Sequence, residues 1–581
     1  MSDPRTIPTS QPSDRPSFTV LVNGTAIPAE CHVASVVVTR VVNRIPFARI
    51  TLLDGDASQE DFPLSTGDLF VPGKEVEIQA GYHSHDETIF KGIITRHAIR
   101  VRQGGGSILT VECRNKAVKL TVGRKNACFR DKKDSDVFGD IVGHYSLSAD
   151  AAATDVTHKE LVQYGSTDWD FMVSRAEANG MVIIAGDDKI AIDKPQFSSK
   201  PVLTLLYGAT LLELDAEMDA RTQYSSVKGH SWDYAKQEMI EEAGAARGVQ
   251  TPGNVSNSDL AGVIGLSDYI LQHPGSIGSN ELKAWAASQA MKSSIAKVQG
   301  RAKFIGFAGV KPGDMLELKG VGDRFNGKAW VSGVRHELGP GVWTTDAQFG
   351  LSPQWFFEEH ETEMAPASGL LPGVHGLQTG VVASLEDPDG EDRVRVKLPM
   401  IASDSDGVWS RVASLDAGNK RGAFFRPEVS DEVVIGFLND DPRNPVILGM
   451  LNSSKLPAPI TASNDNHEKG FVTRSEMKVI FNDDKKSITI QTPKGKSIVI
   501  DDNSGSIILK DENNNKIELG ASGITLESGK DVIIKATGDL KMEGVNIEMK
   551  ASAGLKAEGS GNLELKTSGT AVLKGSMVQI N

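Results

Sequence analysis

The sequence predicts a mainly β protein with some α-helix, ending in a β-helical rod that three chains build together. Short alternating runs separated by turn residues fill much of the N-terminal half. Five further runs follow between residues 371 and 457, enough for one small barrel. From Ile488 to the C-terminus, apolar residues come in pairs two apart, the spacing of one face of a strand.

Composition limits the class of protein. A chain of 581 residues exceeds one hydrophobic core and predicts several domains. With 58 glycines and 6% aromatic residues, it has the composition of short strands and many turns. The formal net charge of -14 argues against a general nucleic-acid binder, so no nucleic-acid partner is expected.

The chain shows no secretory signal and no apolar run of membrane-spanning length. Its cysteines, Cys31, Cys113 and Cys128, give no disulfide framework. We therefore expect assembly in the cytoplasm without a signal peptide. If the protein acts outside the cell, a machine must deliver it there.

The N-terminal region begins with a polar arm, residues 1–16, which we expect to be disordered. Strands are predicted at residues 18–22, 34–40, 48–53, 75–80, 88–99 and 107–113. Gly104-Gly105-Gly106 lies between two of these runs and predicts a hairpin turn rather than a phosphate loop. His83 and His85 could share a strand face as metal ligands, but a polar hairpin tip explains them without a metal.

Two helices are predicted next. Ser135 or Asp136 can cap a first one over residues 137–142. In the second, Ser166 or Thr167 is the N-cap, acids occupy the first turn, and Gly180 ends the helix. Its Asp168 and Asp170 resemble a catalytic carboxylate pair, but capping explains both.

After residue 214 the sequence predicts an irregular segment, a helix and further strands. Residues 238–280 are rich in Gly, Ala and Ser and are expected to be loop-like. A helix follows over residues 281–298, then strands at 304–307, 315–319, 329–338 and 344–351, and a linker at 364–369. The five barrel strands are expected at residues 376–385, 393–398, 407–412, 432–438 and 446–450, as in an OB-fold.

The rod is predicted from its repeat. The first members of the later apolar pairs lie seven or eight residues apart, and turn formers fill the gaps. So short a repeat cannot bury its apolar face alone, and winding three chains about one axis also removes the strand edges. A single-chain solenoid remains the alternative. The candidate trimer-axis core is Ile524, Leu526, Val532, Ile534, Leu540, Met542, Ile547, Leu555, Leu563 and Leu565.

Taken together, several runs resemble the VgrG spike proteins of type VI secretion and related contractile injection systems. They are equally similar to the fused hub and cell-puncturing proteins of contractile phage tails. The matching runs are Tyr164–Phe171, Phe304–Gly350 with Gly313-Asp314, Phe325-Asn326-Gly327 and His336, Arg426–Val433 and Asn439–Gly449.

The resemblance implies a homotrimeric, phage-tail-like spike. Residues 17–365 would form a baseplate hub of β-barrel-like domains on a hexameric inner tube protein, and residues 371–457 an OB-fold collar. A linker at 458–475 would lead to the β-helical spike at 476–581. Baseplate proteins and effector cargo would be partners, and sheath contraction would bring transient contact with the target membrane. A PAAR-type tip protein would contact Val578, Ile580 and Asn581.

The resemblance also implies what to expect of chemistry. A lysozyme domain lies between barrel and rod in phage puncturing proteins, but here that gap holds only a linker and a short strand. We expect no C-terminal toxin, no metal at a rod end without histidine, no cofactor and no enzymatic activity.

Two alternatives stay open: a trimeric fibre or adhesin binding surface glycans, and a puncturing peptidoglycan hydrolase. The rod has no aromatic residue from Ile488 onward, which disfavours the first, and no nucleophile elbow or zinc-protease motif occurs. A type VI system, an extracellular injection particle and a prophage tail all fit the sequence.

Overall fold

The computed structural model describes residues 15–83, 85–103, 105–400 and 406–580. Asn581, predicted to contact a tip protein, and most of the predicted disordered arm lie outside these residues. The chain divides into two compact units, residues 1–375 with 438–442, and residues 376–437 with 443–581. None of the described helices is long and apolar enough to cross a bilayer.

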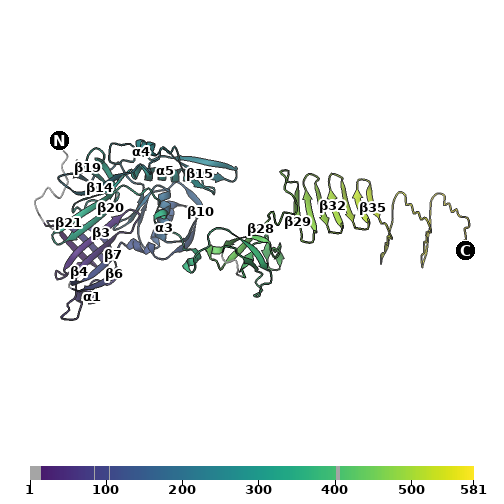
Figure 1. Ribbon diagram of the computed structural model, residues 1–581, viewed down its shortest axis with the longest axis horizontal. Coiled ribbons are helices and arrows are strands. Elements are labelled where there is room, and N and C mark those ends of the chain that lie inside the picture. The colour runs from purple at the N-terminus through teal and green to yellow at the C-terminus, as the bar shows by residue number, and fades with distance from the viewer. Residues whose placement is uncertain (1–14, 84, 104, 401–405, 581) are drawn as a thin grey trace. The chain divides into compact units, whose positions relative to one another are not determined.

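The first unit is organised by a large, mostly antiparallel sheet (Figure 1). Its strands alternate buried and partly exposed residues, as in Val33–Val41, because one face covers the core around Ile50, Ile78 and Val111. The strands are β1 (Ser17–Val22), β2 (Thr25–Ala26), β3 (Val33–Val41), β4 (Phe47–Leu53), β5 (Glu75–Tyr82), β6 (His85–Arg102), β7 (Gly105–Arg114), β13 (Leu203–Leu206), β14 (Leu211–Met218), β18 (Val298–Ile305), β19 (Met315–Lys319), β20 (Gly327–Gly339) and β21 (Val342–Phe349). All six N-terminal strand predictions are confirmed.

A second core in this unit forms around α3 (Asp168–Ala178). Trp169, Met172, Val173 and Ala176 form the buried stripe that the sequence predicts, and the Thr167 hydroxyl caps the helix by accepting from the Asp170 N–H. The elements around it are η2 (Lys116–Thr121), β8 (Lys125–Lys133), α2 (Asp134–Gly143), β9 (Ala149–Ala151), β10 (Thr157–Ser166), β11 (Val182–Ala185) and β12 (Ile190–Asp193).

The prediction of an irregular segment over residues 238–280 is wrong. This stretch contains β16 (Glu238–Gly244), α4 (Asn257–Ile264) and β17 (Tyr269–His273). Strand β15 (Val227–Asp233) pairs with both β16 and β17, and α5 (Ser279–Ile295) follows. Pairing with a central strand makes a strand of the glutamate-rich β16, whose own propensity is low. The remaining short helices are α1 (Pro63–Thr66), α6 (Phe356–Glu359) and η3 (Pro366–Gly369).

In the second unit, five strands close into the predicted barrel, in the order β22-β23-β24-β28-β27. Its core contains Val382, Val396, Val433, Ile435 and Ile447. The strands are β22 (Gln378–Ser384), β23 (Val394–Lys397), β24 (Val408–Val412), β27 (Glu432–Phe437) and β28 (Pro445–Leu451), with a small hairpin of β25 (Ala417–Gly418) and β26 (Arg421–Gly422). The short helix η4 (Leu438–Asp440) belongs to the first unit.

Seven antiparallel strands of one chain form a separate sheet in the second unit (Figure 1). They are β29 (Glu468–Val472), β30 (Lys478–Asn482), β31 (Ser487–Gln491), β32 (Ser497–Asp501), β33 (Ser506–Lys510), β34 (Lys516–Gly520) and β35 (Gly523–Glu527). The sheet begins inside the predicted linker at 458–475. From residue 528 to 580 no helix or strand forms within the described chain.

The expected uniform rod therefore has two parts. In residues 468–527 each strand returns beside the one before it, so the strands between the two edges pair on both sides within one chain. In residues 528–580 the extended backbone has no such partner strand. In a rod of intertwined chains a segment has no partner strand in its own chain, because its neighbouring strands come from the other chains.

Candidate functional site: the apolar face of the C-terminal sheet

Two columns of apolar side chains run along one face of the seven-stranded sheet. Residues directly opposite each other in neighbouring strands share a face, and the register places apolar residues opposite one another at each step. The first column is Phe471, Val479, Ile490, Ile498, Leu509, Ile517 and Leu526. The second column is Phe481, Ile488, Ile500, Ile507, Leu519 and Ile524.

Among the described residues of the second unit, no layer covers this apolar face. The eight isoleucine and leucine side chains that the two columns take from β31 to β34 are each 37–45% exposed. A sheet with one apolar face must bury it against another layer, and soluble monomers rarely expose so continuous an apolar patch. The face therefore requires an occupant, and identical faces of other copies of the chain match it in length and chemistry.

The structure brings together two of the predicted trimer-axis residues. Ile524 lies opposite Leu519 and Leu526 opposite Ile517, at the last strand of the two columns. The other candidates are exposed and lie in the segment without strands: Val532, Ile534, Leu540, Met542, Ile547, Leu555, Leu563 and Leu565. The predicted tip contacts Val578 and Ile580 are exposed near the end of that segment.

Sequence reasoning left three column members out. Phe471, Val479 and Phe481 lie in β29 and β30, within or just after the predicted linker. Val479 and Phe481 are two residues apart, the same spacing that identified the later pairs. That alternation was the available signal, and it places the start of the apolar face upstream of Ile488.

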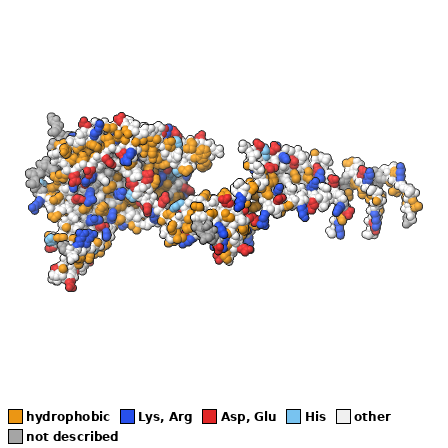
Figure 2. Space-filling view, viewed as in Figure 1, with side chains coloured by type: hydrophobic (Ala, Val, Ile, Leu, Met, Phe, Trp, Pro, Cys, Tyr) orange, Lys and Arg blue, Asp and Glu red, His pale blue; other side chains and the backbone are white. Residues whose placement is uncertain are grey.

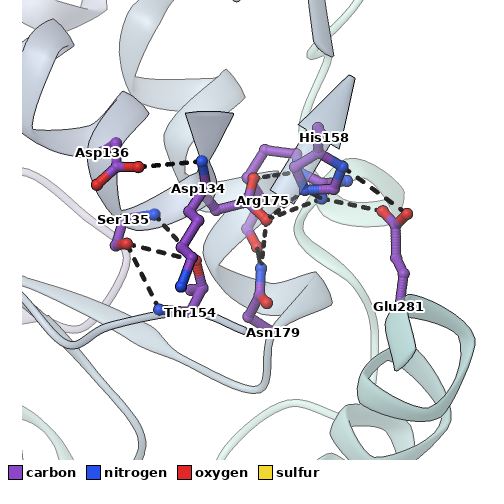
Figure 3. A network of polar contacts seen from close by, with 9 residues as sticks. Asp134, Ser135, Asp136, Thr154, His158, Arg175, Asn179 and Glu281 are labelled. Atoms are coloured by element: carbon purple, nitrogen blue, oxygen red, sulfur yellow. Dashed lines mark hydrogen bonds and ion pairs between the residues drawn. The ribbon is translucent and has the colours of Figure 1, made fainter. Parts of the chain in front are cut away.

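A polar network in the first unit connects four elements (Figure 3). The buried Asp134 carboxylate accepts bonds from Arg175 Nε at 2.8 Å and Arg175 Nη2 at 2.9 Å. His158 Nε2 lies 3.0 Å from the same carboxylate, and Arg175 Nη2 also donates to Glu281 at 3.0 Å. Burial acts to raise the pKa of Asp134, but the bonds and charge of Arg175 outweigh it and hold that pKa below its ordinary value.

These groups satisfy one another, so the network acts as a brace between α2, β10, α3 and α5. It was not predicted. Ser135 and Asp136, proposed as caps, lie within α2, where the Asp136 carboxylate accepts from the Lys133 N–H at 3.1 Å.

The catalytic interpretation of Asp168 and Asp170 gains no support. Asp170 bonds the Thr167 hydroxyl in the predicted cap. Asp168 is not explained by capping: its carboxylate accepts from Lys125 at 2.8 Å, Tyr145 at 2.6 Å and Gln163 at 2.9 Å. Both carboxylates are thus held by neighbouring side chains.

Other potential sites in the first unit have the same character. A cavity of about 810 Å³ is lined by charged residues that already pair, Lys292 with Glu177 at 2.7 Å and Arg301 with Asp215 at 2.7 Å. His83 and His85 flank the β5–β6 turn as the hairpin interpretation expects. Among the described residues, no three His, Cys, Asp or Glu side chains gather as a metal site. On the face drawn in Figure 2, basic and acidic side chains are interspersed.

Three family models match successive parts of the chain. Residues 12–339, more than half of it, match the Alg8 N-terminal domain, and this part of the chain belongs to that family. Residues 378–451 match the type VI secretion system/phage-baseplate injector OB domain, which is the closed barrel. Residues 487–581 match the phage baseplate V C-terminal trimerisation domain, which contains most of the two columns.

Type VI secretion system spike proteins are similar to parts of the chain. The type VI secretion system spike protein VgrG1b of Pseudomonas aeruginosa is 23% identical over 69% of this chain and 57% of its own length. The chain thus matches little more than half of that protein. Among solved structures, a 43 kDa tail protein of Shewanella oneidensis prophage MuSo2 is 10% identical over 58% of this chain and 98% of its own, at a TM-score of 0.43. The type VI secretion component c3393 of E. coli is 14% identical over 74% and 99%, at 0.37.

Proposed function

The chain belongs to the VgrG-like spike proteins, and from this premise we propose that it is the hub and spike of a contractile injection machine. Three copies assemble about one axis. The barrel forms a collar, and residues from 468 onward form the shaft that crosses the target envelope when the sheath contracts. The role is mechanical and needs no active site.

The observation that carries the proposal is the pair of apolar columns on an uncovered sheet. Three such sheets, face to face, bury both columns on a common axis and leave the mixed opposite face outside, where Thr489 and Glu518 lie in register with Val499 and Ile508. Burial contributes about 25 cal/mol per Å² of apolar surface, so a stack of such layers outweighs the cost of association.

Residues 528–580 continue the shaft along the same axis, but their strands pair between chains rather than within one chain. Their apolar pairs recur every seven or eight residues, and successive repeats form no strand pairs within the chain over residues 528–580. In the proposed rod, each strand lies beside strands of the other two chains, which supply the hydrogen bonds missing from a single chain. This part can only form after three chains have met.

The proposed partners follow from the same arrangement. The hub, residues 17–365, would rest on a hexameric inner tube protein and join the baseplate proteins. A PAAR-type tip protein would cover the exposed Val578 and Ile580, and effectors would ride on that tip or on the hub. Assembly would take place in the cytoplasm, and contraction would then carry the spike out of the cell or into its target.

A pair of substitutions on one strand tests the proposal in the producing cell. Ile500→Asp places three carboxylates on the axis, where like charges cannot be solvated, and should abolish assembled particles. Val499→Asp changes the adjacent residue on the opposite face and should leave assembly intact. Particles are counted by negative-stain electron microscopy. Normal assembly of the Ile500→Asp protein would contradict the proposal.

The hydrolase alternative has a direct test. A peptidoglycan zymogram of the purified chain should show no clearing, with a lysozyme lane as the positive control. Clearing by this chain would add an enzymatic role to the mechanical one.

A further inference from the structure

An aromatic stack joins the barrel to the start of the apolar face. Phe425, in the loop between β26 and β27, lies over Phe471 of β29, with ring centroids 5.2 Å apart and planes 9° from parallel. Phe471 is the first member of the first column. The stack therefore adds one layer to that column, contributed by the barrel rather than by the sheet.

The loop that carries Phe425 is anchored on both sides. Arg426 Nε donates to Asp392 at 3.1 Å, which ties the loop to the segment before β23. Glu428 accepts from Arg474 at 2.9 Å, which ties it to the turn after β29. These bonds hold the Phe425 ring at the first column without enclosing it.

The aromatic side chains at this junction are largely uncovered. Phe425 is 57% exposed, Phe471 50% and the adjacent Phe424 78%. Stacked aromatic rings gain most when their outer faces are also removed from water. One chain therefore leaves this aromatic layer largely exposed, as it does the two apolar columns.

We propose that Phe425 and Phe471 form the first layer of the trimer interface of the shaft, closed by the same residues of two further copies of this chain. The inference rests on the proposed trimer and extends it: the interface of the shaft begins with a barrel loop, upstream of residue 487, where the match to the trimerisation domain starts. Each barrel is thereby fixed to the common axis, so that axial force passes from collar to shaft through packed aromatic rings rather than through the connecting segment 452–467.

A second copy is the occupant that the observations favour. The first column runs without a break from Phe471 through Val479 and Ile490 into the trimerisation domain, so whatever covers the lower layers reaches the upper one. If a different protein covered the layer of Phe425 and Phe471, it would have to displace the other copies of this chain from one end of a continuous apolar face.

Single cysteines in the full chain test the proposal. The background is Cys128→Ser, which removes the exposed thiol and leaves the buried Cys31 and Cys113. Phe425→Cys and Phe471→Cys are treated with a short bis-maleimide and examined on denaturing gels. Ile490→Cys, in the first column, is the positive control, and Thr489→Cys, on the opposite face of the same strand, is the negative control.

We expect Phe425→Cys, Phe471→Cys and Ile490→Cys to yield mainly two-chain products, and Thr489→Cys at least tenfold less. Cross-linking of Ile490→Cys without Phe425→Cys would overturn the inference and leave the trimer standing. If none of the variants cross-links and the untreated protein has the mass of one chain, the trimer itself is refuted and the inference with it. Circular dichroism of each variant verifies that the fold is retained.

Discussion

His336 shows how one buried side chain makes the hub sensitive to acid. It lies in β20, 2% exposed, with Nδ1 2.9 Å from the Thr345 hydroxyl. Burial, with a contribution from the charge of Arg40, lowers the pKa of His336 from 6.5 to about 3. The unfolded chain therefore binds a proton that the folded hub cannot accept.

This difference predicts a loss of stability as the pH falls from about 6.5 toward 3. At pH 4 the free energy of unfolding should be lower than at pH 7 by about 3 kcal/mol from this group. In His336→Gln that portion of the pH dependence should disappear, whereas His32→Gln, at an exposed histidine, should keep it. Urea unfolding of each protein at both pH values measures it. Equal pH dependence in all three proteins would contradict the assignment.

The Asp134–Arg175 pair makes a second prediction at the scale of single residues. Asp134→Asn removes a buried charge that Arg175 and His158 contact, and should lower the free energy of unfolding of the hub by about 3 kcal/mol. Asp131→Asn, three residues earlier, breaks an exposed pair with Lys159 and should cost less than about 1 kcal/mol. Similar losses in the two variants, measured by denaturant unfolding, would show that the network is no brace.

At the scale of elements, the two parts of the shaft should respond differently to substitution. Ile534 belongs to the predicted axis of residues 528–580, and the two-residue alternation predicts its neighbour Ile533 on the outer side. Ile534→Asp should abolish the intertwined part and leave the hydrogen-bonded sheet of residues 468–527 formed. Ile533→Asp should change neither. Hydrogen exchange read by peptide distinguishes the outcomes, and protection after residue 528 in the Ile534→Asp protein would place Ile534 outside.

Elements whose pattern is local could be predicted from the sequence. The alternation in the hub strands, the stripe of α3 and the five barrel runs carry their own periodicity, and each is found where expected. The region 238–280 could not be read this way, because β16 takes its structure from pairing with β15. The Ser256–Asp259 capping box of α4 was a signal that the composition obscured.

The candidate site was predicted only in part, again for physical reasons. Strands β31 to β34 begin at Ser487, Ser497, Ser506 and Lys516, nine or ten residues apart, which is room for a strand and a tight return, and β35 follows after seven, at Gly523. The later repeat of seven or eight is a different construction, but both parts carry apolar residues two apart, so the sequence pattern predicts one uniform rod. Phe425 could not be predicted, because its partner Phe471 lies in another element far along the chain and neither residue has a local pattern.

At the scale of the whole molecule, the central claim is that three chains share one shaft. The hub and barrel each bury their own cores, whereas the sheet exposes its apolar face and the last segment forms no strand. A single chain thus buries the apolar cores of its hub and barrel but leaves the apolar residues of its shaft exposed. The most direct test is the mass of the purified chain in solution by multi-angle light scattering. We predict the mass of three chains down to the lowest measurable concentration, and a stable species with the mass of one chain would contradict the account.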